Sequence, residues 1–447
     1  MNKLLTTCLS GALLLVISTN CTAKQWTLKN CIDHALANNI SLKKAKLQEY
    51  SAIEDVKQSQ ATLFPSFSFS SSHGVTYRPW PESGRAAVDN GYVQSVVNKA
   101  YYSGSYNVSA NWTVWNGGRN TKTIKQNKLT AEQAKLDSAQ TANSIQEQIA
   151  QLYVQILYSH DAIAVSKNNL ATSAKNEERG KEMLTVGKIS KADFAQLAAQ
   201  KAQDEYNVVE AESNLKNYKR QLKQLLQITD NEEFDVVVPE ITDEMALRNI
   251  PKLNDVYSAT LAIRPEIKNA KLGIESSNLG IKIAKAQRMP TIGMNAGVST
   301  NTTSMSDNKW GMQLKNNMNI GGGLTVSIPI SDNRATKTAI NKMQLQKQNY
   351  ILDLKDKQTS LYSTIENYWL QAIINQNKFK AAKMSTQSAT ASYELLSEQF
   401  QQGLKNIVEL MTSKNNLLTA QQNELQSKYL TILNIDMLHF YETGKLD

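Results

Sequence analysis

Cysteine, proline and aromatic residues are scarce in this sequence. Of three cysteines only Cys31 lies beyond the first 23 residues, which excludes a disulfide framework and a C-x-x-C site. The chain has eight prolines, and 7% of its residues are aromatic. Length alone suggests two or three ordinary domains, but segments rich in Ala, Gln, Asn, Ser, Lys and Leu favour long solvated helices instead.

A long apolar run is also missing, since no segment after the N-terminus approaches the roughly 20 residues of a transmembrane helix. The N-terminus itself has a basic Lys3, an apolar stretch Leu4–Ile17 and small residues before Ala23. These features predict a secretory signal peptide over residues 1–23. The alternative is that Cys21 is a lipidated first residue, although Asn20 stands where a small residue is expected.

Sequence signatures of catalysis, metal binding and nucleic-acid binding are absent. The net charge of +9 comes from lysines spread among nearly as many carboxylates, without a basic run containing aromatics, so we expect no nucleic-acid partner. The four histidines stand singly, which predicts no metal site. Gly117-Gly118 and Gly321–Gly323 lack the Lys-Ser/Thr ending of a phosphate loop. We therefore expect neither an enzyme nor a cofactor.

Internal repetition is the most informative feature that is present. The triplet at Ala45–Leu47 recurs at Ala270–Leu272, and RNTKT from Arg119 recurs as RATKT from Arg334. The order of the other matches is the same, with Pro65 answered by Pro290, Gly187 by Gly403 and Asp193 by Glu409. A preserved series of this kind predicts two structural repeats.

Each repeat follows one order of elements: a helix of about thirty residues, two strands, and a long helical hairpin. We predict repeat 1 over 24–230, with strands at about 65–78 and 102–116 and a hairpin tip near Gly187. A linker at 231–252 follows. Repeat 2 covers 253–447, with strands at about 290–300 and 321–331 and a tip near Gly403. The first helices, 28–63 and 256–289, each end at a proline.

The strands alternate strictly between apolar and small polar residues. In the second strand the apolar set is Tyr106, Val108, Ala110, Trp112 and Val114. Serines, asparagines and a threonine lie between them. This period is shared by half-buried sheets and by barrels with lipid outside and water inside. The Ser/Asn/Gly character of the polar face favours the barrel.

Four strands cannot close a membrane barrel, because single-chain barrels start at about eight strands. An open edge in lipid would leave backbone groups unpaired. Other copies of the chain must therefore complete the sheet. Three copies would give twelve strands and a wide lumen, whereas two would give eight.

The hairpin helices are too long for a globular fold. Residues 119–179 and 334–402 contain neither Gly nor Pro, and the second stretch would span on the order of 100 Å. Apolar residues recur at three-four spacing as in a coiled-coil seam. They are Ile145, Ile149, Leu152, Ile156 and Ile163 in the first half, and Leu361, Ile365, Tyr368, Ala372 and Phe379 in the second.

The signal peptide and the doubled order of helix, two strands and glycine-tipped hairpin resemble the TolC family of outer-membrane efflux ducts. The resemblance covers essentially the whole chain after residue 23. It implies a mainly α fold in which a homotrimeric, twelve-stranded β-barrel in the lipid of a Gram-negative outer membrane continues into a periplasmic helical coiled-coil barrel. It also implies a periplasmic adaptor protein and an inner-membrane pump as partners.

The hairpin tips carry the residues that the resemblance singles out. In TVGKISKADFAQL from Thr185 and QQGLKNIVELM from Gln401, a glycine precedes a carboxylate by the same spacing. Ser190 and Asn406 are candidates to cap the following helices. Matching positions of the family dock the adaptor, which assigns that role here to Val186, Gly187, Ser190, Gly403, Leu404 and Asn406.

The resemblance also implies a gate at the tips. Glu409 falls on a position where the family carries an acidic ring, and Lys405 and Asp193 fall on a basic–acidic pair that latches neighbouring helices. The family's second acidic ring would fall on Thr412, which leaves Glu409 as a single ring. The alternative is that these three charges are ordinary solvated helix residues.

Two other classes of protein share some of these features. A periplasmic adaptor also has an export signal and a helical hairpin, but one hairpin rather than two that each follow a strand pair. A structural coiled-coil protein of the envelope would not need the alternating strands. The sequence names no cargo, adaptor or pump.

Overall fold

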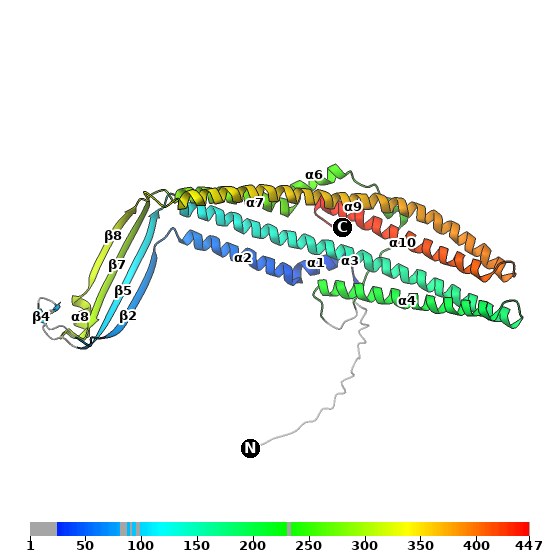
Figure 1. Cartoon of the computed structure of the whole chain (residues 1–447), viewed down its shortest axis with the longest axis horizontal. Coiled ribbons are helices and arrows are strands. Elements are labelled where there is room, and N and C mark those ends of the chain that lie inside the picture. Colours follow the sequence, from blue (N-terminus) through cyan, green and yellow to red (C-terminus); the bar gives the residue numbers. More distant parts are fainter. Residues whose placement is uncertain (1–24, 81–86, 90–91, 95–98, 230–233, 447) are drawn as a thin grey trace, which may run out of the picture. The chain divides into compact units, whose positions relative to one another are not determined.

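The computed structural model describes residues 25–80, 87–89, 92–94, 99–229 and 234–446. The expected signal peptide and Cys21 lie outside these residues. The chain forms two compact units. The first comprises Met1–Asn38, Glu147–Arg248 and Asn375–Leu433, and the second Asn39–Gln146, Asn249–Ile374 and Asn434–Asp447. The long helices α3 (Arg119–Thr185), α9 (Ala335–Gln401) and α10 (Ile407–Thr443) contribute residues to both units (Figure 1).

The first unit is dominated by two helical hairpins. One joins the second part of α3 to α4 (Lys191–Leu225), and the other joins the second part of α9 to α10. The remaining elements are β1 (Gln25–Trp26), α1 (Leu28–Asn38), β6 (Asp235–Val236) and α5 (Asp243–Ala246). Strands β1 and β6 pair in parallel, so the N-terminal segment is bonded to the linker between the repeats.

The second unit contains a four-stranded antiparallel sheet and the helices that follow or precede its strands. The sheet order is β2-β5-β7-β8. Its elements are α2 (Ile40–Ala61), β2 (Ser66–Tyr77), β5 (Ala100–Trp115), α6 (Leu253–Ile263), α7 (Pro265–Ala286), β7 (Thr291–Thr303), α8 (Trp310–Asn316) and β8 (Asn319–Ser327). The short strands β3 (Ala87–Asp89) and β4 (Tyr92–Gln94) pair with each other.

The single thirty-residue helix predicted at the start of each repeat is wrong, because each is divided in two. Asn39 separates α1 from α2, and its Oδ1 accepts bonds from the Ser41 and Leu42 amides at 2.9 and 3.3 Å. In repeat 2, Pro265 is the first residue of α7, where its missing N–H costs nothing. Asn39, as an N-cap, and Pro265, as a first helical residue, therefore each start a new helix, although the alternation of polar and apolar residues continues across both positions.

The strands follow the predicted alternation with two local differences. The predicted range 321–331 becomes Asn319–Ser327, and the strand ends two residues before Pro329, which has no N–H for a ladder bond. On β5 the pairing shifts between Thr113 and Trp115. This bulge interrupts the alternation at Val114, which the sequence pattern placed with Trp112.

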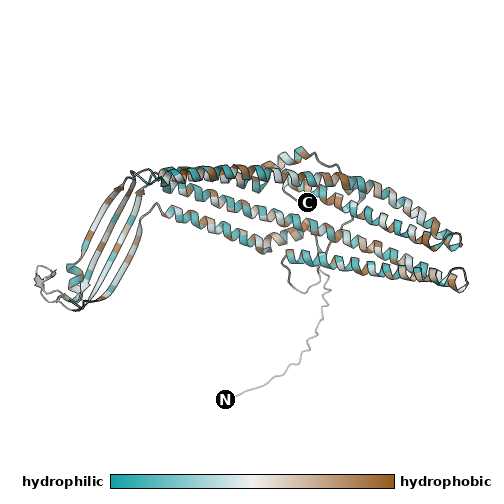
Figure 2. Cartoon of the chain, in the orientation of Figure 1, coloured by the Kyte–Doolittle hydropathy of each residue, from teal (hydrophilic) through white to brown (hydrophobic). Residues whose placement is uncertain are grey.

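The long helices bury a narrow apolar seam. Each of α3 and α9 has 67 residues, which corresponds to roughly 100 Å of helix. Buried seam positions are Ile145, Ile149, Ile156, Leu361, Ile365, Ala372 and Phe379. Elsewhere hydrophilic and hydrophobic residues are interspersed along these helices (Figure 2). None of the helices in the described ranges is both long and apolar enough to cross a membrane.

Two residues with positive φ connect strand to helix in each repeat. In repeat 1 they are Gly117 and Gly118, and a Cβ on Gly117 would lie 2.5 Å from that of Met289. In repeat 2 they are Asn333 and Arg334, with φ of 50° and 69°. Gly117-Gly118 therefore forms the turn into α3.

The linker between the repeats is bonded to the second hairpin. Asp243 on α5 forms ion pairs with Lys383 of α9 at 2.6 Å and Lys428 of α10 at 2.9 Å. Next to this pair, Ala246 packs with Phe379 and Ile432 in a cluster where all three are buried. One short helix thus ties α9 to α10 through both charge and apolar contact.

These ion pairs predict a specific pH dependence of stability. Hydrogen bonds from Lys383 and then Lys428 lower the pKa of Asp243 below its usual 3.8. The stabilisation is therefore fully present above the unfolded pKa and is lost as pH falls through the folded one. The difference in urea midpoint between the wild type and Asp243→Asn should be constant above about pH 5 and shrink below about pH 4. A difference that persists unchanged at about pH 3 would show that the carboxylate charge does not act here.

The C-terminal end of α10 is fixed to α6 by a buried arginine. The Arg264 guanidinium lies 3.9 Å from the Tyr441 ring centre and 4.9 Å from that of Phe440. Thr260 Oγ1 donates to the Tyr441 carbonyl at 2.8 Å. A guanidinium over two aromatic rings is stabilised by cation–π attraction, which is stronger where water is excluded.

Candidate functional site: the hairpin tips and the sheet

Each hairpin tip is a glycine-terminated helix followed by a tight reversal. Gly187 and Gly403 have φ of +74° and +78°, a left-handed conformation that only glycine adopts without strain. After α3, the Lys188 amide donates to the Met183 carbonyl at 2.8 Å. After α9, the Leu404 amide donates to the Gln399 carbonyl at 2.9 Å. Both ends are Schellman motifs, so the two repeats stop their helices in the same way.

The helix after each tip begins with a reciprocal cap. Ser190 Oγ accepts from the Asp193 amide at 3.1 Å, and the Asp193 carboxylate accepts from the Ser190 amide at 3.0 Å. In repeat 2, Asn406 Oδ1 accepts from the Glu409 amide at 2.9 Å, and the Glu409 carboxylate accepts from the Asn406 amide at 3.4 Å. Asp193 and Glu409 therefore hold the same position in two capping boxes.

The three candidate gating charges are not one network within a single chain. Lys405 Nζ lies 3.0 Å from Glu409 Oε1 one turn away, and this bond lowers the pKa of Glu409 below its usual value. The Asp193 carboxylate bonds Ser190 instead. No hydrogen bond or ion pair joins Asp193 to Lys405 within the described chain.

The ends of both tips expose apolar side chains. Val186 is 69% exposed and Leu404 is 70% exposed. Behind them the two hairpins share an apolar cluster of Leu197, Phe400, Ile407 and Leu410. The tips of one chain therefore contact each other through a buried core and leave apolar residues at the outer end.

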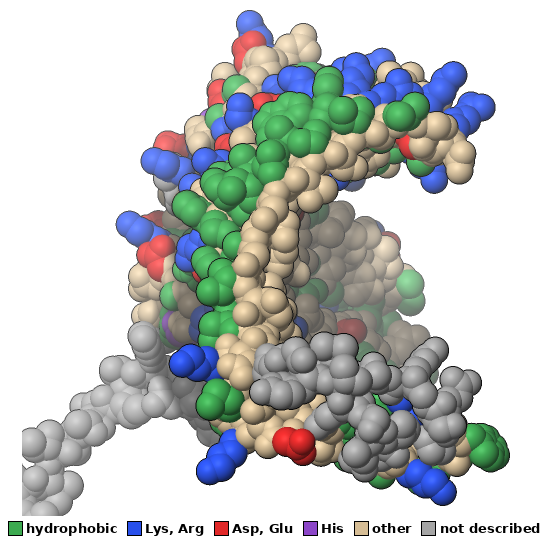
Figure 3. Space-filling model, turned by 90° about the vertical axis from the view of Figure 1, so that its left-hand side faces the viewer, with side chains coloured by type: hydrophobic (Ala, Val, Ile, Leu, Met, Phe, Trp, Pro, Cys, Tyr) green, Lys and Arg blue, Asp and Glu red, His purple; other side chains and the backbone are tan. Residues whose placement is uncertain are grey.

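The two faces of the sheet differ sharply in chemistry. The register places Phe69, Val108, Val298 and Ile320 on one face. The opposite face carries small uncharged polar residues and glycines: Ser68, Ser70, Asn107, Ser109, Asn295, Gly297, Ser299, Asn319, Gly321 and Gly323. Figure 3 shows hydrophobic side chains along one side of the curved sheet, whereas the other side shows backbone and side chains that are neither hydrophobic nor charged.

The polar face is hollowed where glycines carry no side chain. A depression of about 430 Å³ lies over Asn107, Asn111 and Asn295, next to Gly297, Gly321 and Gly323. Among its lining residues none is charged. Strands of this face can therefore border water without attracting ions of either sign.

Among the described residues, each of the two edge strands pairs on one side only. β2 pairs with β5, and β8 pairs with β7. The apolar face and the two open edges belong to the same sheet. Within this chain the edge strands therefore leave backbone donors and acceptors without ladder partners.

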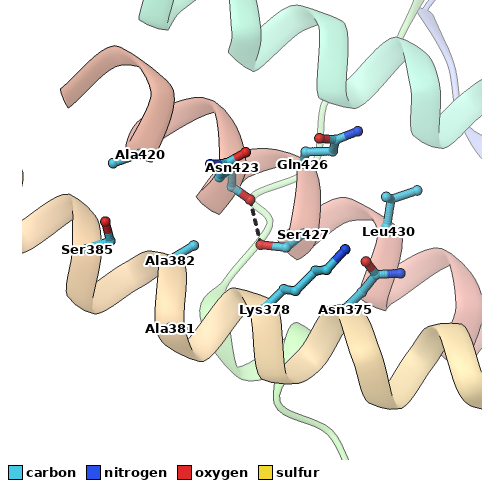
Figure 4. Close-up of a pocket in the computed structure, with 10 residues that line it drawn as sticks. All are labelled: Asn375, Lys378, Ala381, Ala382, Ser385, Ala420, Asn423, Gln426, Ser427 and Leu430. Atoms are coloured by element: carbon cyan, nitrogen blue, oxygen red, sulfur yellow. Dashed lines mark hydrogen bonds between the residues drawn. The ribbon is translucent and has the colours of Figure 1, made fainter. Parts of the chain in front are cut away.

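A groove of about 450 Å³ separates α9 from α10 (Figure 4). Small residues line it, including Ala381, Ala382, Ser385 and Ala420, and Lys378 is its one charged lining residue. Ser427 Oγ donates to the Asn423 carbonyl of its own helix at 2.7 Å. These groups offer neither a nucleophile with a base nor a set of metal ligands.

The described residues hold no cluster of His, Cys, Asp or Glu able to bind a metal ion. Burial raises the pKa of the Cys31 thiol to about 12, so this cysteine stays protonated and unreactive at neutral pH.

The family model of outer membrane efflux proteins matches residues 31–226 and 256–434. A relative, the toxin and drug export protein A of Aggregatibacter actinomycetemcomitans, is 22% identical over 92% of this chain and 84% of its own length. The outer membrane protein TolC of Salmonella enteritidis is 20% identical over 64% of this chain and 58% of its own length.

Solved structures show the same fold. The CmeC outer membrane channel of Campylobacter jejuni superposes with a TM-score of 0.75 at 17% identity, covering 93% of this chain and 86% of that one. The open state of the Neisseria gonorrhoeae MtrE outer membrane channel gives 0.71 at 16% identity, covering 93% and 88%.

The two matched segments, each with a strand pair and a hairpin, confirm the predicted repeats and the mainly helical fold with a four-stranded sheet. They also exclude the adaptor and the structural coiled-coil alternatives. The chain belongs to the outer membrane efflux protein family and is a TolC-family efflux channel of the Gram-negative outer membrane.

Proposed function

We propose that three copies of this chain close a twelve-stranded barrel in the outer membrane, with their hairpins forming a periplasmic tunnel. The observation that carries this proposal is the sheet itself, whose apolar face and two unpaired edges occur together. In lipid each edge needs a partner strand, and β2 of one copy can pair with β8 of the next. Twelve strands leave an aqueous lumen, whereas eight are filled by their own side chains.

The tunnel would conduct passively. The inner face of the proposed barrel carries Ser, Asn and Gly without charge, and the described residues hold no cluster able to bind a metal ion. Energy would therefore come from an inner-membrane pump, reached through a periplasmic adaptor. The exposed Val186 and Leu404 support adaptor docking at the tips, because exposed apolar residues at a rigid, capped turn suit a protein partner.

Within this proposal the chain consists of a signal peptide over 1–23, repeats over 24–230 and 253–447, and a linker over 231–252. Mass measurement on the detergent-extracted protein tests the assembly. We expect a complex of three chains that keeps its mass on dilution. A protein that stays monomeric in every mild detergent would refute the barrel.

The proposed gate predicts a rise in conductance when its charges are removed. We expect Lys405→Ala with Glu409→Gln to raise single-channel conductance in planar bilayers, because Lys405 would no longer latch neighbouring helices. We also expect lower cation selectivity, because three Glu409 carboxylates around one axis would attract cations. Glutamine is chosen because it keeps the capping box with Asn406 while it removes the charge.

Two matched variants make this test specific. Glu409→Ala removes both the charge and the cap. A rise in conductance with Glu409→Ala but not with Glu409→Gln would therefore be caused by fraying of the helix. Lys167→Ala with Glu212→Ala removes an exposed α3–α4 ion pair of 2.8 Å and should leave conductance unchanged. If the Gln variant conducts as the wild type does, Glu409 is a capping residue without a gating role.

A further inference from the structure

A buried ion cluster lies directly behind the hairpin tips. Lys414 of α10 forms an ion pair with Asp204 of α4, and their side chains are 4% and 1% exposed. Ser173 of α3, also buried, donates to the Asp204 carboxylate and accepts from Lys414. Gln200 donates to the second Asp204 oxygen at 3.1 Å. Three helices from both hairpins therefore meet in one hydrogen-bonded cluster.

The cluster is packed against the apolar core of the tips. A cavity of only about 10 Å³ lies among its members, and Leu197 and Leu410 of the tip core line the same cavity. This volume is at the lower limit for a single water molecule. At most one water molecule could therefore compensate for a lost partner, and separating the charges would leave each of them buried with little else to bond.

The polar cluster occurs in one repeat only. Counted from the tip glycines Gly187 and Gly403, the positions that match Ser173 and Asp204 are Ala389 and Ala420, and Lys414 matches Ala198. The hairpin geometry is therefore compatible with alanine at all three places. Buried ionic groups that packing does not require can instead fix which helix pairs with which, and in what register.

We propose that the Asp204–Lys414–Ser173 cluster pins hairpin α3–α4 to hairpin α9–α10, so that the two tips of one chain move as a single body. Lys414 is the crossing element of this cluster, since Ser173 and Asp204 both belong to the first hairpin.

Distances between spin labels test the pin. Labels at the exposed positions Val186→Cys and Leu404→Cys report the separation of the tips, and Cys31 is buried and unreactive. Labelled chains are mixed with excess unlabelled chain so that each complex reports one intrachain distance. We expect a narrow distribution in the wild type that broadens with Asp204→Asn, which removes the carboxylate charge and leaves Lys414 buried without it.

Amide exchange gives an independent readout of the same variant. Loss of one partner from a buried pair should speed exchange near residues 407–414 by about 100-fold. Asp204→Leu with Lys414→Met should restore a narrow distance distribution, because an apolar pair of similar volume leaves no unpaired charge. Lys167→Ala, which breaks an exposed ion pair between α3 and α4, should leave the distribution narrow.

The outcomes separate the pin from the duct. If Asp204→Asn gives the wild-type distribution and wild-type exchange, the pin is refuted. If that variant fails to assemble while the Leu/Met pair assembles with a narrow distribution, the pin is supported. The distance should also stay the same in the more conductive Lys405→Ala/Glu409→Gln variant, and a shift on opening would refute single-body movement. Absence of any conductance would refute the duct and leave the distance result standing.

Discussion

Arginine at position 108 should abolish insertion of the protein into the outer membrane. Val108 lies in the middle of β5, on the apolar face between Phe69 and Val298, and is 48% exposed in the single chain. A lipid-facing arginine near the bilayer centre costs roughly 2–4 kcal/mol in a membrane barrel. In a barrel built from several copies this cost recurs once per chain, so Val108→Arg should lose most of the assembled form.

The neighbouring residue provides a matched control. Asn107 lies on the same strand but faces the polar side, where it pairs with Ser70 and Ser299. Asn107→Arg should assemble normally and make the open pore more anion-selective. Membrane fractionation, followed by gel analysis without heating, measures the assembled fraction of each variant. If both variants lose the assembled form equally, the two faces of the sheet do not contact lipid on one side and water on the other.

Truncation of Phe379 should detach the linker from the second hairpin. This side chain is fully buried against Ala246 and Ile432, next to the ion pairs of Asp243. Phe→Ala at such a site costs about 3–5 kcal/mol, because it removes apolar contacts and leaves a cavity. We expect a lower urea midpoint and faster tryptic cleavage after Arg248 and Lys252, which follow α5.

Met384 supplies the control for this substitution. It lies on the same helix α9 and is 64% exposed, so Met384→Ala removes a long apolar side chain that packs little. Its urea midpoint and cleavage rate should match the wild type. If Phe379→Ala is as stable as Met384→Ala, α5 is not anchored by this cluster.

Periodicity and repetition predicted most of the architecture. Strand alternation depends on adjacent residues such as Asn107 and Val108, and the hairpin turns depend on Gly187 and Gly403. These are local signals, and the structure reproduces them as β5 and as two Schellman turns. The helix breaks at Asn39 and Pro265 were missed although each leaves a local signal, an N-cap residue and a proline at the first helical position.

The charged residues of the hairpin tips illustrate a different limit of prediction from the sequence. Asp193 and Glu409 were selected by resemblance to a gate, and the structure adds that each closes a capping box. The capping role is predictable from the sequence, because each carboxylate follows Ser190 or Asn406 at the spacing of a capping box. The Asp204–Lys414 pair left no such trace, because it joins residues far apart in the chain whose pairing depends on how two hairpins pack.

Single-channel recording shows whether the assembled protein conducts ions. The purified full-length protein is added to one side of a planar lipid bilayer, with Val108→Arg as the negative control. The proposed duct predicts discrete conductance steps for the wild type, larger steps for Lys405→Ala with Glu409→Gln, and none for Val108→Arg. If a correctly folded oligomer inserts into the bilayer and carries no current, both as the wild type and as the Lys405→Ala/Glu409→Gln variant, the proposed duct is refuted.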